Sequence, residues 1–179
     1  MIKLRPAQYG DVDEIALLHT AGWRDTYGNV MSSDFLENYA QKELLSYWNS
    51  VLSKYSDDVA VFVAEKEGKV EGFICVKLQN DAQWGAYIDS LHISSALRGQ
   101  GAGKKLLRHA AEWINGMDAV SAIYLWVFED NVRATIFYQN VGGVIVERTV
   151  SDLPSADKAP IFRVSWKNAS QLIMGTLGA

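Results

Sequence analysis

The segment with the clearest chemical meaning contains glycines at alternate positions, Gly99, Gly101 and Gly103, between a predicted strand and a predicted helix. Glycine lets the backbone turn tightly and lets a ligand approach it closely, because it has no side chain. The N–H groups at the start of a helix lack partners within the helix and carry the positive end of its dipole. With the neighbouring cations Arg98 and Lys104, the segment predicts a site for a phosphate group.

Two other phosphate-binding patterns do not fit this segment. The dinucleotide pattern G-x-G-x-x-G needs a third glycine where Lys104 or Leu106 stands. The P-loop pattern G-x-x-x-x-G-K-[ST] needs a glycine at Arg98 and a serine or threonine at Lys105. A nucleotide-binding module is therefore disfavoured. The remaining alternative to a ligand site is a flexible turn with solvated lysines.

A second group of polar residues lies at a predicted helix, 132–141. Asn131 directly precedes this helix, where its side chain can cap the first turn. Tyr138 follows Asn131 by seven residues, so it lies about two turns further along the same helix face. Both residues have a purely structural interpretation, Asn131 as the cap and Tyr138 as an ordinary core tyrosine.

Hydrophobic periodicity predicts the elements that position these residues. The predicted strands are 2–5, 59–65, 70–78, 85–93, 122–128, 143–149 and 160–166, and the predicted helices are 12–26, 33–54, 101–115 and 132–141. Strand 85–93, helix 101–115 and strand 122–128 form a βαβ unit, whose two strands are parallel. The early hairpin at 59–78 is antiparallel. We therefore expect a mixed sheet with helices packed on it.

Length and charge limit the classes of protein. The chain has 179 residues, of which 49% are hydrophobic and 21% are charged, as in ordinary globular domains. We expect one domain at 1–167, followed by a C-terminal tail at 168–179 that frays or packs on a partner. The 17 Lys and Arg residues against 21 Asp and Glu give a net charge of −4, so we expect no nucleic acid partner.

The single cysteine, Cys75, excludes an intrachain disulfide and lies in an apolar run, so we expect it to be buried. The cysteine and the three histidines lack the spacing of zinc ligands, which predicts no metal site. No segment contains the roughly 20 apolar residues that span a membrane. The first residues lack the apolar region of a signal peptide. We therefore expect a cytoplasmic protein without a membrane partner.

Three segments together resemble the GNAT superfamily of N-acetyltransferases. Arg98-Gly99-Gln100-Gly101-Ala102-Gly103 is similar to the family's pyrophosphate loop, 87–93 to its fourth strand, and 131–138 to its N-x-x-A-x-x-F-Y helix. The likeness runs from Ile2 to about Trp166 in element order. It implies an α/β fold with a mixed, mostly antiparallel sheet, a central βαβ unit and helices on both faces. It also implies an enzyme that uses acetyl-CoA as its co-substrate.

The resemblance implies roles for particular residues. Asn131 would bond the pantetheine or pyrophosphate part of the cofactor, and Tyr138 would place its phenol near the thioester sulfur. Backbone N–H groups at 91–93 would bond the acetyl oxygen and the pantetheine. The cofactor-binding residues that it implies are Leu91, His92, Ile93, Arg98, Gly99, Gln100, Gly101, Ala102, Gly103, Lys104, Asn131, Ala134 and Tyr138.

The group that removes a proton from the amine is less well defined by the sequence. Asp89, His92 and Glu129 are the candidates, and a water relay or the lack of a dedicated base stays open. Each candidate also has a structural interpretation. Asp89 can be a hydrogen-bonded strand carboxylate, His92 a packed or surface histidine, and Glu129 a solvated loop charge.

The residues that contact the amine are predicted from the same resemblance. Trp23 and Tyr27 lie four positions apart at a helix end and so face the same way. With Tyr87, they either belong to the core or shape the amine pocket. His19 and His109 are expected to be structural.

The reaction we expect is direct attack of an amine on the thioester. A small-molecule primary amine is the leading acceptor, and a peptide or protein N-terminus or a lysine is the alternative. A catalytically silent module that senses acyl-CoA is the competing class. The resemblance also leads us to expect a homodimer.

Overall fold

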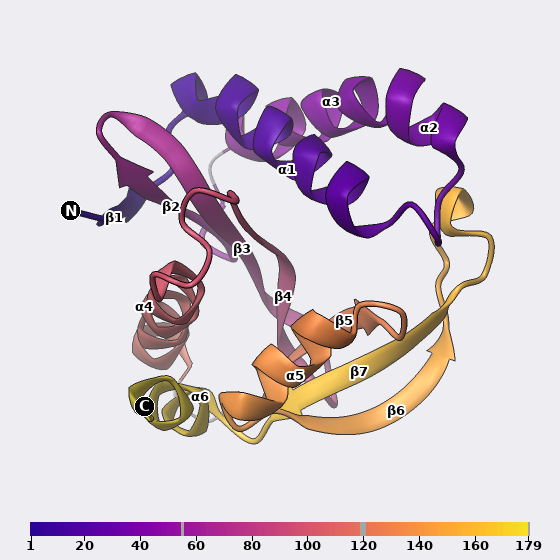
Figure 1. Cartoon of the computed structure of the whole chain (residues 1–179). Helices are drawn as coiled ribbons and strands as arrows, with labels where there is room; N and C mark the ends of the chain where they lie inside the picture. The colour runs from indigo at the N-terminus through magenta and orange to yellow at the C-terminus, as the bar shows by residue number, and fades with distance from the viewer. Residues whose placement is uncertain (55, 119–120, 179) are drawn as a thin grey trace.

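The computed structural model describes residues 1–54, 56–118 and 121–178. Within them, seven strands form one sheet in the order β1-β2-β3-β4-β5-β7-β6 (Figure 1). The strands are β1 (Lys3–Pro6), β2 (Val59–Lys66), β3 (Lys69–Asp81), β4 (Gly85–Ile93), β5 (Ile123–Phe128), β6 (Val144–Val150) and β7 (Pro160–Trp166). The pair β4–β5 is parallel, and the other pairs among the described residues are antiparallel. This confirms the mixed, mostly antiparallel sheet.

Helices cover both faces of the sheet (Figure 1). The helices are α1 (Val12–Thr26), α2 (Ser33–Asn38), α3 (Ala40–Leu52), α4 (Ala102–Met117), α5 (Val132–Asn140) and α6 (Ala169–Leu177). Successive side chains of β2 point to opposite faces of the sheet, because side chains alternate along a strand. Val61 and Val63 pack in the cluster that contains α1 and α3. Phe62 and Ala64 pack in the cluster that contains α4 and α6.

The predicted helix 33–54 is two helices in the structure. Its backbone departs from helical geometry at Tyr39, where φ is −123°, and α3 begins at the next residue. The Ser32 side chain caps α2 by accepting a hydrogen bond from the Phe35 N–H at 3.2 Å. Apolar residues recur every four positions across this break, at Leu36, Ala40, Leu44 and Trp48, so periodicity alone shows no boundary here.

The C-terminal segment is helical rather than a loose tail. Asn168 caps α6 by accepting a hydrogen bond from the Gln171 N–H at 3.0 Å. Ala169 and Leu172 are buried in the same core as α4. The Lys104 Nζ donates to the Gly178 carbonyl at 2.8 Å. Residues 169–177 therefore pack against α4 and the core beside it, while Ala179 lies outside the described residues.

Cys75 is fully buried in β3, as predicted, and burial raises the pKa of its thiol. A protonated, enclosed thiol suits a packing role rather than nucleophilic chemistry. Among the described residues, no group of three or more side chains is arranged to hold a metal ion. No helix in the same part of the chain is long and apolar enough to cross a membrane.

Strands β4 and β5 separate after a short contact, and this separation creates the site. They pair at Ala86 with Ile123 and at Tyr87 with Tyr124. Further along, β4 follows β3 while β5 follows β7. Cys75 pairs with Ser90 and Val76 pairs with Ile88, so the residue between them, Asp89, is the extra residue of a bulge.

Candidate active site

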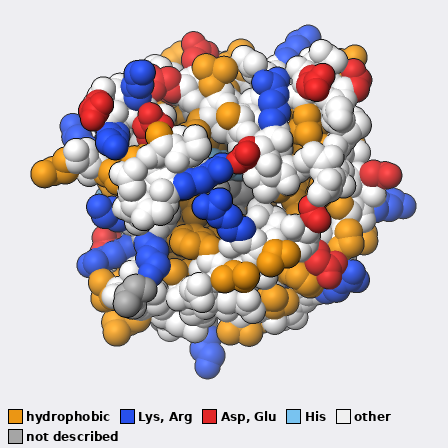
Figure 2. All heavy atoms as spheres, viewed as in Figure 1, with side chains coloured by type: hydrophobic (Ala, Val, Ile, Leu, Met, Phe, Trp, Pro, Cys, Tyr) orange, Lys and Arg blue, Asp and Glu red, His pale blue; other side chains and the backbone are white. Residues whose placement is uncertain are grey.

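A groove with a cavity volume of about 1710 Å³ lies between the separated strands. Its walls come from α1, α3, β4, α4, β5, α5, β6 and β7. Figure 2 shows the surface hollowed near its centre, with basic side chains crossing the opening. The volume exceeds the roughly 300–1,000 Å³ of a pocket for one small ligand. The groove therefore has room for two reactants.

The glycine segment forms one end of the groove. Gly99 and Gly101 have φ angles of 78° and 75°, in the left-handed region that favours glycine. Gly101 is the residue that precedes α4. A Cβ at either position would meet no atom within 4 Å, so backbone conformation rather than packing requires glycine there. Open space at the start of a 16-residue helix fits a bound pyrophosphate.

Most of the residues that the resemblance implies for the cofactor lie along this groove. Those that line it are Leu91, His92, Ile93, Arg98, Gly99, Gly101, Ala102, Gly103, Lys104, Asn131, Ala134 and Tyr138. Gln100 is the exception in the implied set. Its side chain folds back and donates to the Ala96 carbonyl at 2.6 Å, so it stabilises the loop from outside the groove.

Arg98 connects the glycine segment to α1. Its Nη2 lies 2.6 Å from Oδ2 of Asp25, and both residues line the groove. The ion pair spans the opening between α1 and the loop. Asp25 offsets part of the positive charge that Arg98 brings to an anionic ligand.

Helix α5 contributes Asn131 and Tyr138. The Asn131 Oδ1 accepts a hydrogen bond from the Ala134 N–H at 3.2 Å, which confirms the capping role. The Tyr27 hydroxyl also bonds to the Asn131 side chain. Tyr138 is buried, with its surface facing the groove, and burial raises the pKa of its phenol. The phenol therefore keeps its proton at neutral pH and can act as a donor.

His92 is packed among rings on the groove wall. It stacks on Phe73 at 5.4 Å between ring centroids and lies 4.4 Å from the His19 ring. Burial, with a smaller effect from Arg98, lowers the pKa of His92 to about 4. The geometry thus favours the packing interpretation of His92.

Asp89 is the candidate base that lies in the groove with its carboxylate held by two donors. The Tyr47 hydroxyl donates to Oδ2 at 2.6 Å, and the Lys77 Nζ donates to Oδ1 at 3.0 Å. Lys77 also contacts the Tyr47 oxygen at 3.2 Å. Tyr47 lies in α3, 42 residues from Asp89 in the sequence, and no local pattern predicted it.

Glu129 lies outside the groove. Its Oε2 is 2.8 Å from Nη2 of Arg148, and it borders a separate cavity of about 430 Å³ that also contacts Asn29 and Asp130. The structure therefore does not bring this predicted candidate base to the other site residues.

The predicted amine-contacting residues all line the groove. Trp23 and Tyr27 also pack in the core, since Trp23 lies 5.0 Å from the His19 ring and Tyr27 lies 4.9 Å from the Phe128 ring. Tyr87 stacks on Tyr124 at 4.9 Å. Trp23 and Tyr27 therefore pack in the core and also form part of the groove wall.

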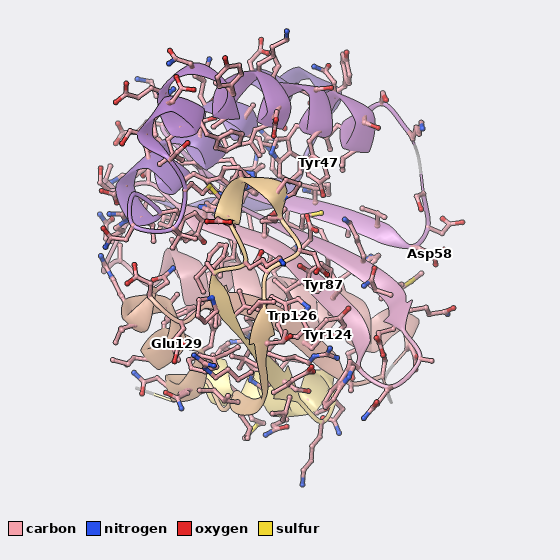
Figure 3. All side chains as sticks on the ribbon, turned by 90° about the vertical axis from the view of Figure 1, so that its right-hand side faces the viewer. Tyr47, Asp58, Tyr87, Tyr124, Trp126 and Glu129 are labelled. Carbon is pink, nitrogen blue, oxygen red and sulfur yellow. The ribbon has the colours of Figure 1, made fainter. Side chains whose placement is uncertain are left out.

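The part of the groove that lies away from the glycine segment is lined by aromatic and acidic side chains. Figure 3 shows Tyr47, Tyr87, Trp126 and Tyr124 following one another down the view, with Glu129 to one side. Tyr47, Tyr87 and Trp126 line the groove, as do Asp89, Glu147 and Arg163. Sequence reasoning missed Trp126, Glu147 and Arg163, because only the pairing of β5, β7 and β6 brings them together.

We predict that the protein loses stability as the pH falls from 7 to 5. His19 is buried, accepts a hydrogen bond from Trp48 Nε1 at 3.1 Å, and has a pKa well below its usual value because of burial. The unfolded chain then binds protons near pH 6.5 that the folded chain does not, so acid favours unfolding. The slope is up to about 1.4 kcal/mol per pH unit for each such histidine.

Urea unfolding at several pH values measures this slope, and His19→Gln should reduce it. An equal slope in the variant would contradict the assignment to His19.

The sequence matches the acetyltransferase (GNAT) family over residues 23–142. An uncharacterized N-acetyltransferase of Bacillus subtilis strain 168, YuaI, is 32% identical over 142 residues, which cover 78% of each chain. The PaiA N-acetyltransferase of Thermoplasma acidophilum, crystallised with coenzyme A, superposes with a TM-score of 0.66 at 20% identity, over 93% of this chain and 99% of that chain. A GCN5-related N-acetyltransferase structure from Rhodopseudomonas palustris gives a TM-score of 0.73 at 17% identity, over 92% and 94% of the two chains.

Proposed function

Because this chain belongs to the acetyltransferase (GNAT) family, whose co-substrate is acetyl-CoA, we propose that it acetylates a small-molecule primary amine in the groove. The observation that carries the proposal is the contrast between the two ends of one cavity. One end has the glycine segment with Arg98 and Lys104, and the other has Asp89 among aromatic rings. Tyr138 and strand β4 line the same cavity and can serve both reactants.

The residues at the first end fit the cofactor. Gly99 and Gly101 expose backbone at the start of α4, and Asn131 and Ala134 line the groove further along. Acetyl-CoA, when bound, supplies an activated acetyl group with a thiolate as its leaving group. The backbone of β4 beyond Tyr87 does not pair with β5 among the described residues. Its N–H groups are therefore the donors that we assign to the acetyl oxygen and the pantetheine.

Proton transfers fall to Tyr138 and Asp89 in this proposal. The Tyr138 phenol holds its proton, so it can give that proton to a leaving thiolate. Each Asp89 oxygen accepts one hydrogen bond in the structure, and a carboxylate oxygen has two lone pairs. Asp89 can therefore accept a further N–H from an incoming amine. Asp89 is favoured because its carboxylate oxygens accept hydrogen bonds in the groove, whereas His92 is packed among rings and Glu129 lies outside the groove.

The acceptor end is bounded on several sides, which favours a small molecule over a protein chain. Glu43 and Tyr47 of α3 line it on one side, and Glu147 and Thr149 of β6 on another. Asp152 lines the cavity from the loop that follows β6. A peptide N-terminus or a lysine side chain stays the second acceptor class, since either could enter such a pocket end-on.

The release of free thiol from acetyl-CoA tests the proposal. We expect release with small primary amines and little with peptides or denatured protein. Asp89→Asn should raise the KM for the amine about tenfold or more, the cost of a lost hydrogen bond to a charged group. It should also lower kcat, because an amide cannot take the proton of the amine, while the KM for acetyl-CoA changes little. Asp58→Asn is the matched control, because Asp58 is an exposed carboxylate outside the groove (Figure 3).

Two outcomes would contradict the proposal. Turnover with peptides but not with small amines would move the function to the second acceptor class. Binding of CoA without turnover of any amine would instead support the sensing module.

A further inference from the structure

Arg163 is a partly buried cation at the acceptor end that the acetyl transfer itself does not use. It lies in β7, opposite Trp126 of β5 and Glu147 of β6. Its side chain is 13% exposed and lines the groove. The guanidinium carbon lies 4.4 Å from the centre of the Trp126 ring, 4.6 Å from Trp84 and 5.2 Å from Tyr124. These rings hold the cation in place at the groove wall.

The hydrogen bonds of Arg163 are incomplete. Its Nη2 lies 3.0 Å from Oε2 of Glu147. Its Nε and Nη1 are buried and have no hydrogen-bond partner in the part of the chain that the structure describes. A guanidinium carries five N–H donors, and buried charged donors without acceptors are unfavourable. An unsatisfied donor beside a cavity can take the missing acceptor from a ligand.

Aromatic rings in contact with one another connect Arg163 to Asp89, and of these Tyr87 and Trp126 line the groove while Tyr124 is buried. The Arg163 guanidinium lies over Tyr124, and Tyr124 stacks on Tyr87 at 4.9 Å. Tyr87 lies in β4, two residues before Asp89. Figure 3 shows Tyr87, Trp126 and Tyr124 close together in the same part of the view. Two rings therefore separate the carboxylate proposed for the amine from the guanidinium.

From this arrangement we propose that the acceptor carries a carboxylate as well as its amine, joined by an apolar or aromatic spacer, and that Arg163 determines this specificity. The inference rests on the proposed function and names its substrate class. A guanidinium is a strong partner for a carboxylate, and the rings between the two groups can contact the spacer.

The same charges disfavour a simple polyamine. Asp89 is already paired with Lys77, and Glu147 is paired with Arg163. Neither of these two carboxylates offers an uncompensated negative charge to a second ammonium group, although Glu43 and Asp152 also line the groove, so the argument against a polyamine depends on the position of Arg163. Arg163 itself repels a cation that lies along the aromatic rings.

A matched pair of amines tests the proposal: 4-(aminomethyl)benzoate and 4-methylbenzylamine, which differ in the carboxylate. We expect the wild-type kcat/KM for thiol release to favour the carboxylate compound about tenfold or more, as for a charge-assisted hydrogen bond. Arg163→Met should remove this preference, and Arg163→Lys should keep part of it. Arg148→Met is the control, because Arg148 is an exposed arginine of β6 paired with Glu129 outside the groove.

Binding provides a second readout that does not need turnover. Titration of each compound without acetyl-CoA, followed by tryptophan fluorescence, should show tighter binding of the carboxylate compound, and Arg163→Met should abolish the difference. Thermal melting checks that each variant is folded.

Equal kcat/KM values and equal binding for the two compounds would overturn the inference, as would a loss in Arg163→Met that is the same for both. Turnover of amines without a carboxylate preference would overturn this inference alone. Binding of CoA without turnover of any amine would overturn the proposed function, and the fluorescence titration would still decide the role of Arg163.

Discussion

Replacement of Gly101 by glutamate is expected to abolish acetyl-CoA binding while leaving the chain folded. Gly101 has a φ of 75° and directly precedes α4, and a Cβ there would point into open space. A carboxylate at this position would face the bound pyrophosphate. Two unit charges about 4 Å apart at a partly buried site repel by about 4 kcal/mol. The dissociation constant should therefore rise about 100-fold or more, since each 1.4 kcal/mol is about tenfold.

Thermal melting with and without acetyl-CoA measures this effect. A ligand at about 100 times its dissociation constant stabilises the folded chain by about 2.7 kcal/mol. This free energy corresponds to several degrees for a chain of this size. The wild type should show that shift and Gly101→Glu should show none.

Two further variants separate charge from backbone strain. Gly101→Ala adds the strain of a left-handed non-glycine residue, about 1–2 kcal/mol, without the charge. Gly116→Glu adds the charge at the far end of α4, where a Cβ also meets no atom within 4 Å. We expect Gly101→Ala to melt earlier but still respond to acetyl-CoA, and Gly116→Glu to respond like the wild type. A full response in Gly101→Glu would show that the loop is not the pyrophosphate site.

The parts of the site that the sequence predicted are those whose chemistry is local. The glycine segment and the start of α4 lie within six residues of one another, from 98 to 103. Asn131 and its hydrogen-bond donor, Ala134, lie within one turn of α5. In each case the residue type and its spacing determine the geometry, because one turn or one cap sets it. Tertiary structure then decides only which surface these residues face.

The parts that the sequence missed depend on pairing between distant segments. Tyr47 meets Asp89 because its hydroxyl reaches from α3 to the bulge residue of β4. Arg163 meets Trp126 and Glu147 because β7 lies between β5 and β6, an order that the chain sequence does not display. A shift of register by one residue would turn each of these side chains to the other face of the sheet. The residues that contact these strand side chains are therefore known only once the register of strand pairing is known.

Glu129 shows that nearness in sequence to a site residue does not place a side chain in the groove. It stands two residues before Asn131, yet its side chain pairs with Arg148 on β6 and borders the second cavity. C-terminal helix α6 was missed for a related reason: its helix signal is short, and packing against α4 supplies most of its stability.

Replacement of Tyr138 by phenylalanine is expected to lower kcat by about 10- to 100-fold, near the lower end of the range for a lost general acid. The phenol lines the groove, and its pKa is raised by burial, so it is protonated at any working pH. The effect should be moderate because a thiol of pKa about 8.5 leaves readily as the thiolate. The variant keeps the ring contacts with Phe137 and Trp166, at 5.3 and 6.2 Å, so the fold should change little.

The comparison of kcat with binding distinguishes a proton donor from a packing residue. In Tyr138→Phe, the thermal shift with acetyl-CoA should stay close to that of the wild type while steady-state thiol release slows. Tyr39→Phe, which removes the same hydroxyl from an exposed tyrosine between α2 and α3, should change neither quantity. An unchanged kcat in Tyr138→Phe would remove the proton-donor role. A parallel loss of acetyl-CoA binding and kcat would mean that the hydroxyl holds the cofactor instead, because an acid that acts only on the leaving thiolate contributes nothing to ground-state binding.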